Sequence, residues 1–199
     1  LLSGITDGMG CTTEITYKSM SDGGVFKRGD TFQYPLSSFG SVWPLVYRVR
    51  TPDGIDGNND VFYYYENAIM HRKGRGFLGF ECFTVKDMSN RAEDKTYYEI
   101  NRKMYVVGVK CQEKDVSDKL VEKQVCENTY VEGWRAYVPA KTTTYTYSDK
   151  SDEILCAVES QTCYDRYGNV TKTVTDNGDV RTVLENAYED DYDRWYLGR

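Results

Sequence analysis

Hydrophobic and polar residues alternate with a period of two through most of this chain. Leu45, Tyr47 and Val49 form one apolar stripe, and the run from Phe80 to Val85 repeats the pattern. This period places successive side chains on opposite faces of a β-strand. Signals for tight turns, such as Asp53-Gly54 and Asn177-Gly178, separate the runs. The pattern predicts an all-β, antiparallel fold.

The clearest predicted hairpin joins Val170–Thr175 to Val180–Leu184. Asn177-Gly178 at its tip supplies the two positive-φ positions of a type I′ turn, whose twist matches that of the flanking strands. The segment Ser117–Tyr130 is ambiguous, because its apolar positions fit either a short helix or a strand. Its strand-like neighbours favour a strand.

Composition narrows the class of protein. The 199 residues include 18 Tyr, 7 Phe and 3 Trp, and 40% are hydrophobic, which excludes a disordered chain. The formal net charge of −6 makes nucleic acid an unsuitable partner. No apolar run approaches the roughly 18 residues that a membrane-spanning helix needs, so no membrane insertion is expected.

No catalytic constellation is evident. His71 is the only histidine, no Gly-x-Ser-x-Gly motif surrounds a nucleophile, and His71 lies beside Arg72 and Lys73 as a solvated strand end would. The 31 acidic residues leave a glycosidase-type carboxylate pair open, but nothing singles one out. The sequence therefore predicts no catalytic residues and no cofactor.

The sequence offers only weak candidates for a metal site and for a disulfide. Asp53, Asp56, Asn58 and Asp60 form a weak candidate for an oxygen-ligand cation site, although Val61 replaces the glycine of an EF-hand loop, and a plain Asx-rich loop is the preferred interpretation. The six cysteines lack zinc-binding spacing, and we expect reduced, half-buried thiols. Cys156–Cys163 is the best disulfide candidate, as neighbours across a hairpin.

Two motifs carry a family resemblance. Tyr164-Asp165-Arg166-Tyr167-Gly168-Asn169-Val170 resembles the YD repeat of bacterial RHS/YD-repeat proteins. In this turn Asp165 would accept backbone hydrogen bonds, Gly168 or Asn169 would take a positive φ, and Tyr164 would pack over the turn. Gly74-Arg75-Gly76-Phe77-Leu78-Gly79-Phe80 resembles a segment of SpvB-type proteins and of the B components of insecticidal toxin complexes. The flanking stretches 5–17, 61–68 and 195–199 resemble that family in the same order.

The resemblance implies a fold and a role. Such proteins are large and exported, with long antiparallel strands that form a curved shell around a toxic or effector polypeptide. Residues 1–199 would be a single non-catalytic scaffold fragment of a larger protein at the cell surface or outside the cell. A subdivision into 1–112, with the Gly74–Phe80 segment, and 113–199, with the YD motif, is expected. The family's self-cleaving core has no counterpart in this sequence.

Partners and local structure follow from this interpretation. The partners would be the rest of the polypeptide shell and an enclosed effector segment, with weak homodimerisation through edge strands. The alternative is a glycan- or protein-binding β-module that uses exposed tyrosines and Trp43, Trp134 and Trp195. We also expect a turn or bulge at Gly74, Gly76 and Gly79, where Phe77 and Phe80 enter the core.

Overall fold

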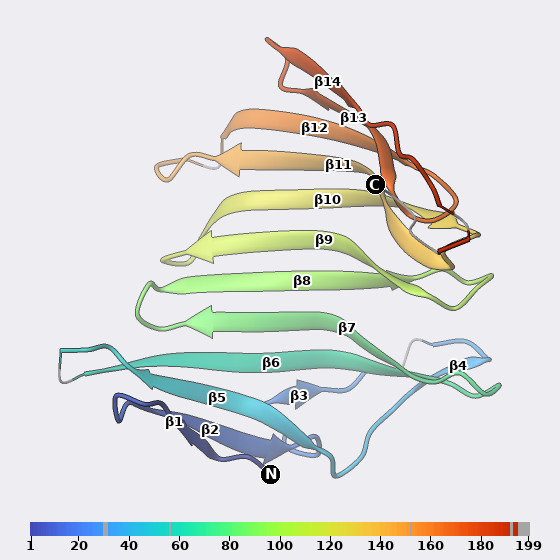
Figure 1. Cartoon of the computed structure of the whole chain (residues 1–199). Coiled ribbons are helices and arrows are strands. Elements are labelled where there is room, and N and C mark those ends of the chain that lie inside the picture. The colour runs from blue at the N-terminus through green and yellow to red at the C-terminus, as the bar shows by residue number, and fades with distance from the viewer. Residues whose placement is uncertain (30–31, 56, 152, 192, 195–199) are drawn as a thin grey trace. The chain divides into compact units, whose positions relative to one another are not determined.

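The computed structural model describes residues 1–29, 32–55, 57–151, 153–191 and 193–194. Within these ranges the chain forms fourteen strands and no helix, which confirms the predicted all-β fold (Figure 1). None of the described residues lies in a helix that could cross a membrane. The strands are β1 (Gly4–Thr6), β2 (Thr12–Ser19), β3 (Phe26–Lys27), β4 (Leu36–Ser38), β5 (Pro44–Pro52), β6 (Asn58–His71), β7 (Gly76–Asp87), β8 (Ala92–Ile100), β9 (Val107–Val116), β10 (Lys119–Val131), β11 (Ala136–Tyr147), β12 (Ile154–Tyr164), β13 (Val170–Asp176) and β14 (Arg181–Glu185).

The chain divides into two compact units. The first comprises 1–98 with 113–120, and the second 99–112 with 121–199. The first unit pairs its strands in the order β1-β2-β5-β6-β7-β8, and the second pairs β10-β11-β12-β13-β14, all antiparallel. Strands β8, β9 and β10 contribute residues to both units. The predicted subdivision at 112/113 falls inside β9 and stays a prediction.

In the first unit, one edge of the long strand β6 is covered by three different strands. β5 pairs with 58–62, the short parallel strand β3 with 65–66, and β4 with 69–71, while β7 covers the opposite edge. The segment that contains β3 brings Met20, Val25 and Phe26 against Ala68, and these four residues form the buried core cluster. The partly buried side chains packed around it are Phe39, Leu45, Tyr47, Tyr65 and Phe80.

The turns of the chain follow residue chemistry, with one difference from expectation. Ser117–Tyr130 is a turn followed by β10, so the strand interpretation is confirmed. Ser117 and Asp118, with φ of 51° and 62°, form the two-residue loop with paired positive φ. The 170–184 hairpin also forms, but its tip is not type I′: Gly178 has a φ of 90°, whereas Asn177 is not left-handed. Four residues separate the paired ends Asp176 and Arg181, and such a loop needs fewer left-handed positions.

Three loops close in the same way around an aspartate. Asp7, Asp53 and Asp165 each accept N–H bonds at 2.8–2.9 Å through Oδ1 from the second and fourth residues onward. The backbone N–H of each aspartate in turn donates to the carbonyl four residues on, at 2.9–3.1 Å. The carboxylate thus satisfies loop N–H groups that no strand can reach.

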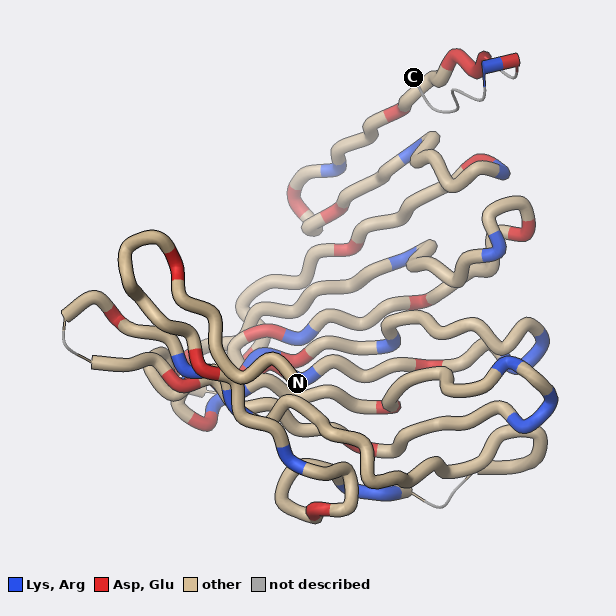
Figure 2. Tube along the Cα trace, turned by 60° about the horizontal axis from the view of Figure 1, so that its bottom comes forward, with Lys and Arg blue, Asp and Glu red and all other residues tan. Residues whose placement is uncertain are grey.

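Charged side chains of both signs are distributed over both units rather than segregated by sign. Figure 2 shows Lys and Arg interspersed with Asp and Glu along strands and loops. Several cross-strand neighbours are of opposite charge, including Arg50 with Asp60 and Lys172 with Glu185. Such pairs stabilise a sheet face that stays in contact with water.

Candidate functional site

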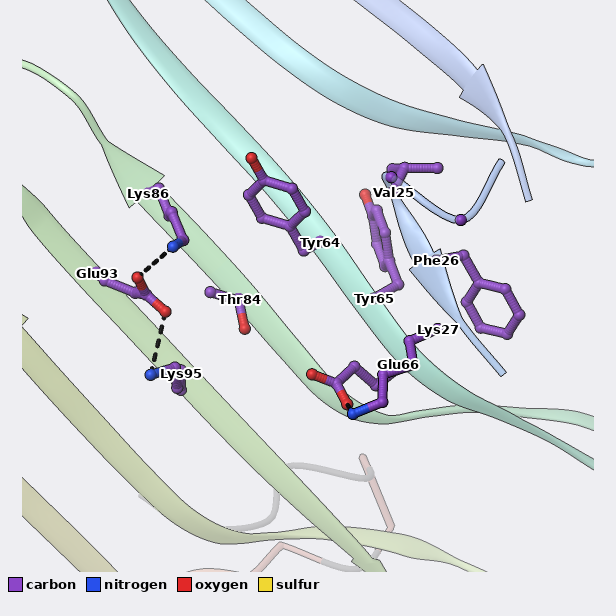
Figure 3. Close-up of a pocket in the computed structure, with 12 residues that line it drawn as sticks. Val25, Phe26, Lys27, Tyr64, Tyr65, Glu66, Thr84, Lys86, Glu93 and Lys95 are labelled. Carbon is purple, nitrogen blue, oxygen red and sulfur yellow. Dashed lines mark ion pairs between the residues drawn. The ribbon is translucent and has the colours of Figure 1, made fainter. Parts of the chain in front are cut away.

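A pocket of about 370 Å³, the Glu93 pocket, lies on the first unit, between the Gly23–Lys27 segment and the middle of the sheet. Tyr64, Tyr65 and Glu66 of β6 form one wall. Thr84 and Lys86 of β7 and Glu93 and Lys95 of β8 form the rest, as the close-up shows (Figure 3). The register of the strands explains the grouping, because Lys86 stands directly opposite Glu93 in the β7–β8 pair.

The charged groups of the pocket neutralise one another. Glu93 accepts from Lys86 at 2.6 Å and from Lys95 at 3.1 Å, while Lys95 also reaches Asp115 at 3.3 Å. Lys27 pairs with Glu66 at 3.3 Å. Three lysines thus face three carboxylates. An arrangement in which each charge already has a partner leaves no net charge to attract an ionic substrate.

The protonation states of these groups follow from their surroundings. Burial by itself favours neutral Glu93, but hydrogen bonds from Lys86 and Lys95 outweigh it and lower the pKa of the carboxyl group. Burial opposes charge on Lys95 too, yet its bonds to Glu93 and Asp115 raise the pKa of the ammonium. Burial raises the pKa of Tyr65 to about 12. These groups are therefore locked in their ordinary charge states at neutral pH, whereas a general acid or base needs a pKa near neutrality.

We expect Glu93→Gln to reduce the acid sensitivity of the fold. Because the folded-state pKa of Glu93 is depressed, its stabilisation is present above the unfolded pKa of about 4.3 and is lost as pH falls through the folded value. The urea midpoint of the unaltered protein should fall between pH 6 and pH 3, and that of Glu93→Gln should fall less. Glu132→Gln, at an exposed turn position, is the matched control. Equal acid sensitivity of Glu93→Gln and the unaltered protein would contradict the assignment.

His71 is buried, whereas the sequence predicted a solvated residue. It is 5% exposed, not a solvated strand end, because β4 pairs with the last residues of β6 and covers it. Its Nδ1 accepts the backbone N–H of Arg75 at 3.4 Å, and it does not line the Glu93 pocket. The neighbouring Arg72, Lys73 and Arg75 are exposed, as predicted for a solvated turn.

The Gly74–Phe80 segment forms the predicted turn and bulge. Gly74, Gly76 and Gly79 have φ of 97°, 75° and 110°, and the β6–β7 register shifts between Ile69 and Met70, opposite Gly79 and Phe77. Phe80 packs on the core cluster. The expectation that Phe77 also enters the core is wrong: it is 36% exposed, because the bulge turns it toward Phe39 and Trp43.

Arg75 and Leu78 complete the segment. Arg75 lies in the exposed turn, and Leu78 is a half-buried residue of β7 beside the bulge. Neither side chain lines the Glu93 pocket. The whole segment is thus a structural element and not part of that pocket.

The YD motif is a closed aspartate loop, as its chemistry predicted. Asp165 accepts from Tyr167 N–H at 2.8 Å and Asn169 N–H at 2.9 Å, and the Asn169 amide donates to its second oxygen at 2.9 Å. Gly168 takes the positive φ, 91°. Tyr164 donates its hydroxyl to the Pro139 carbonyl at 3.0 Å, so it packs toward β11 of the neighbouring hairpin.

The weak cation candidates do not converge in the described part of the chain. Asp53 binds the Ile55 and Gly57 N–H groups, Asp60 forms a two-pronged pair with Arg50 at 2.8 and 2.9 Å, and Asn58 lies at the start of β6 opposite Pro52. Asp56 lies outside the described residues. No three His, Cys, Asp or Glu side chains within the described ranges are grouped as a metal site would require.

The cysteines are free thiols with mixed burial. Cys82 and Cys126 are buried, and burial raises the pKa of both. Cys156 and Cys163 are exposed, which differs from the expected half-buried state, and the proposed disulfide between them is wrong. Both lie on β12, where seven residues span about 23 Å, far beyond the reach of an S–S bond.

The tryptophans proposed as stacking platforms are spread over the chain. Trp43 is 47% exposed and packs on Phe39 and Phe77 in the first unit, whereas Trp134 is 49% exposed and lies over Gly168 in the second. Trp195 lies outside the described residues.

The pocket residues Lys86, Glu93 and Lys95 were not predicted from the sequence. Charged residues at alternate positions on either side of the Met88–Arg91 turn would have indicated a cross-strand network of ion pairs.

Comparison with known proteins identifies the family. The solved structure "Crystal Structure of TcdB2-TccC3-TEV" matches 96% of this chain with a TM-score of 0.60 and 13% identity, which shows a shared fold, and the chain spans 12% of that chain's length. No curated protein sequence matches this chain. The model of the "insecticide toxin TcdB middle/N-terminal region" matches residues 1–109, which include the Gly74–Phe80 segment. The chain therefore belongs to the family of the TcdB middle/N-terminal region, and the resemblance to the B components of insecticidal toxin complexes is confirmed.

Proposed function

We propose that this chain is a non-catalytic β-scaffold segment of a larger, exported toxin-delivery protein. One observation carries the proposal: the sheets bury very little of their own surface. Among the described residues seven hydrophobic side chains are buried, and of these Cys126 alone belongs to the second unit. Such faces suit a wall that other segments cover or that encloses a cargo.

The pocket chemistry supports a scaffold in preference to an enzyme. Glu93, Lys86 and Lys95 are held in mutual ion pairs, and the one histidine lies outside the pocket. On this proposal the partners are the remainder of the same polypeptide and an enclosed effector segment, and the site of action is the cell surface or the extracellular medium. Purified protein should hydrolyse glycoside, ester and peptide substrates at background rates. A turnover abolished by Glu93→Gln would overturn the non-catalytic role.

The edge strand β14 offers a direct test. Each of its five residues is exposed, including Val183 at 50% and Leu184 at 57%, and among the described strands β13 alone pairs with it. The unpaired N–H and C=O groups of an edge strand can form hydrogen bonds with a further strand. In the longer polypeptide we expect the next segment to supply it, and in residues 1–199 alone we expect weak pairing with a second copy.

Amide hydrogen exchange distinguishes these states. The β14 amides that point away from β13 should exchange slowly when residues 1–199 are part of the proposed longer polypeptide, and rapidly in dilute 1–199. The β6 amides, already paired on both edges, serve as the internal control and should not change. Equal β14 exchange in both proteins would contradict the scaffold proposal.

A further inference from the structure

A second cleft, of about 670 Å³, lies on the first unit at the end of β6. It is distinct from the Glu93 pocket and shares no lining residue with it. β4 forms one side, and the Arg72–Gly76 turn forms the other. Its lining includes Arg28, Ser37, Ser38, Phe39, His71 and Arg72.

The charge of this cleft is opposite to that of the protein. Arg28 and Arg72 line it, and no carboxylate is found among its described lining residues, although the chain carries a net charge of −6. Neither arginine pairs with an acid within the described ranges, in contrast to Arg50 or Lys86. Two guanidinium groups without a carboxylate in an open cleft create a positive potential that favours an anionic ligand.

Each guanidinium is positioned by a hydrogen bond to a serine of β4. Arg28 donates its Nε–H to the Ser38 hydroxyl at 3.1 Å, and Arg72 donates its Nε–H to the Ser37 hydroxyl at 2.9 Å. These bonds use the Nε atoms and leave the terminal N–H groups for a ligand. The Arg28 guanidinium also lies against Gly40, whose Cβ position would be 3.7 Å from Nη1. Positioned arginines lose less freedom when they bind a carboxylate, which strengthens the interaction.

An exposed aromatic cluster adjoins the charged part of the cleft. Phe39 lines the cleft and contacts Trp43 and Phe77, with ring centroids 4.8 and 5.7 Å apart. Trp43 and Phe77 are 47% and 36% exposed, and Val42 beside them is 79% exposed. A ligand that occupies the cleft and this cluster would therefore need an anionic group next to an apolar one.

We propose that this cleft binds an acidic peptide segment in which a glutamate or aspartate stands beside an apolar residue. The carboxylate binds Arg28 and Arg72, and the apolar side chain packs on Phe39, Trp43 and Phe77. β4 also suits a peptide, because among the described strands β6 alone pairs with it, so its outer backbone groups face the incoming chain. This inference does not depend on the scaffold proposal and would stand if that proposal failed.

Ring geometry favours a peptide over an acidic sugar. The three rings meet at interplanar angles of 52° to 81°, so edges and faces alternate over the cluster. A sugar ring stacks on a flat aromatic face, whereas a branched aliphatic side chain fits between tilted rings. The apolar part of the ligand is thus an aliphatic or aromatic side chain.

Calorimetric titration with the N-acetylated, C-amidated peptide Leu-Glu-Leu-Glu-Leu-Glu tests the proposal. The peptide should bind the unaltered protein, and added salt should weaken binding. The double variant Arg28→Gln/Arg72→Gln should weaken it by about tenfold or more, because charge-assisted hydrogen bonds are lost. Trp43→Ala should weaken it as well. The double variant Arg102→Gln/Arg181→Gln, which makes the same charge change at exposed positions elsewhere, should bind like the unaltered protein.

Three results would overturn the proposal. Equal binding of the Leu-Gln-Leu-Gln-Leu-Gln peptide would show that the carboxylates are not recognised. An equal loss in the Arg102→Gln/Arg181→Gln control would show that only overall charge matters. Binding of hyaluronate oligosaccharide at this cleft without binding of the peptide would assign the cleft to an acidic glycan.

Discussion

Replacing Phe80 with alanine is expected to lower the free energy of unfolding by about 3 kcal/mol, the low end for deletion of a core phenylalanine because this ring is half-buried. Its ring lies 4.8 Å from that of Tyr65 and 6.1 Å from that of Phe26, centroid to centroid. It therefore packs β7 against Tyr65 of β6 and against the core cluster, and its removal leaves a cavity beside that cluster. Urea-induced unfolding followed by circular dichroism measures the change.

Two further substitutions serve as controls for Phe80→Ala. Phe77→Ala removes an identical ring that is 36% exposed, so a loss of about 1 kcal/mol is expected. Phe80→Leu keeps most of the volume and should cost less than about 1.5 kcal/mol. A loss below about 1 kcal/mol for Phe80→Ala would contradict the burial of the Phe80 ring. A larger loss for Phe77→Ala than for Phe80→Ala would contradict it as well.

Gly168→Ala is expected to destabilise the protein by about 3 kcal/mol or more. Gly168 has a φ of 91°, where a side chain costs about 1–2 kcal/mol. A Cβ there would also lie 2.5 Å from Cε3 of Trp134, the tryptophan of the neighbouring turn. The added methyl group must push the indole ring off the loop, which adds the cost of lost packing. Equilibrium unfolding measures the total, and the near-ultraviolet circular dichroism of tryptophan reports the displaced ring.

Gly178→Ala separates the two contributions. Gly178 has nearly the same φ, 90°, but nothing lies within 4 Å of its Cβ position. It should therefore show the backbone cost alone, about 1–2 kcal/mol. Combining Gly168→Ala with Trp134→Ala should remove the overlap and give less than the sum of the two single effects. Equal losses for Gly168→Ala and Gly178→Ala would exclude an indole contact at Gly168.

The sheet and its turns could be predicted because their signals are local. The alternation from Leu45 to Arg50 depends only on the pleat of a strand, and it predicted β5. Positive φ could be expected at Gly76, at Gly79 and at Gly168 or Asn169, because a positive φ is a property of one residue and its peptide neighbours. The family could also be inferred from sequence, since the Gly74–Phe80 segment is contiguous.

Segments far apart in the chain decide which side chains are buried and which residues lie side by side. Phe77 and Phe80 have the same chemistry, but the core cluster from the Met20–Phe26 segment covers only Phe80. His71 is buried because β4 pairs with it from 35 positions upstream, at Leu36. Cys156 and Cys163 fall on one strand because the turn comes at Asp165, beyond both of them.

The sequence by itself therefore determined strand content, turn positions and family, whereas the tertiary structure decided which faces are covered and which charges meet. Lys86 and Glu93 meet only through the register of β7 and β8. Arg28 and Arg72 line the same cleft because each donates a hydrogen bond to a serine of β4, Ser38 and Ser37 respectively. The physical reason is range. Backbone conformation is set by each residue and its neighbours, but burial and electrostatic pairing depend on which distant segment packs alongside.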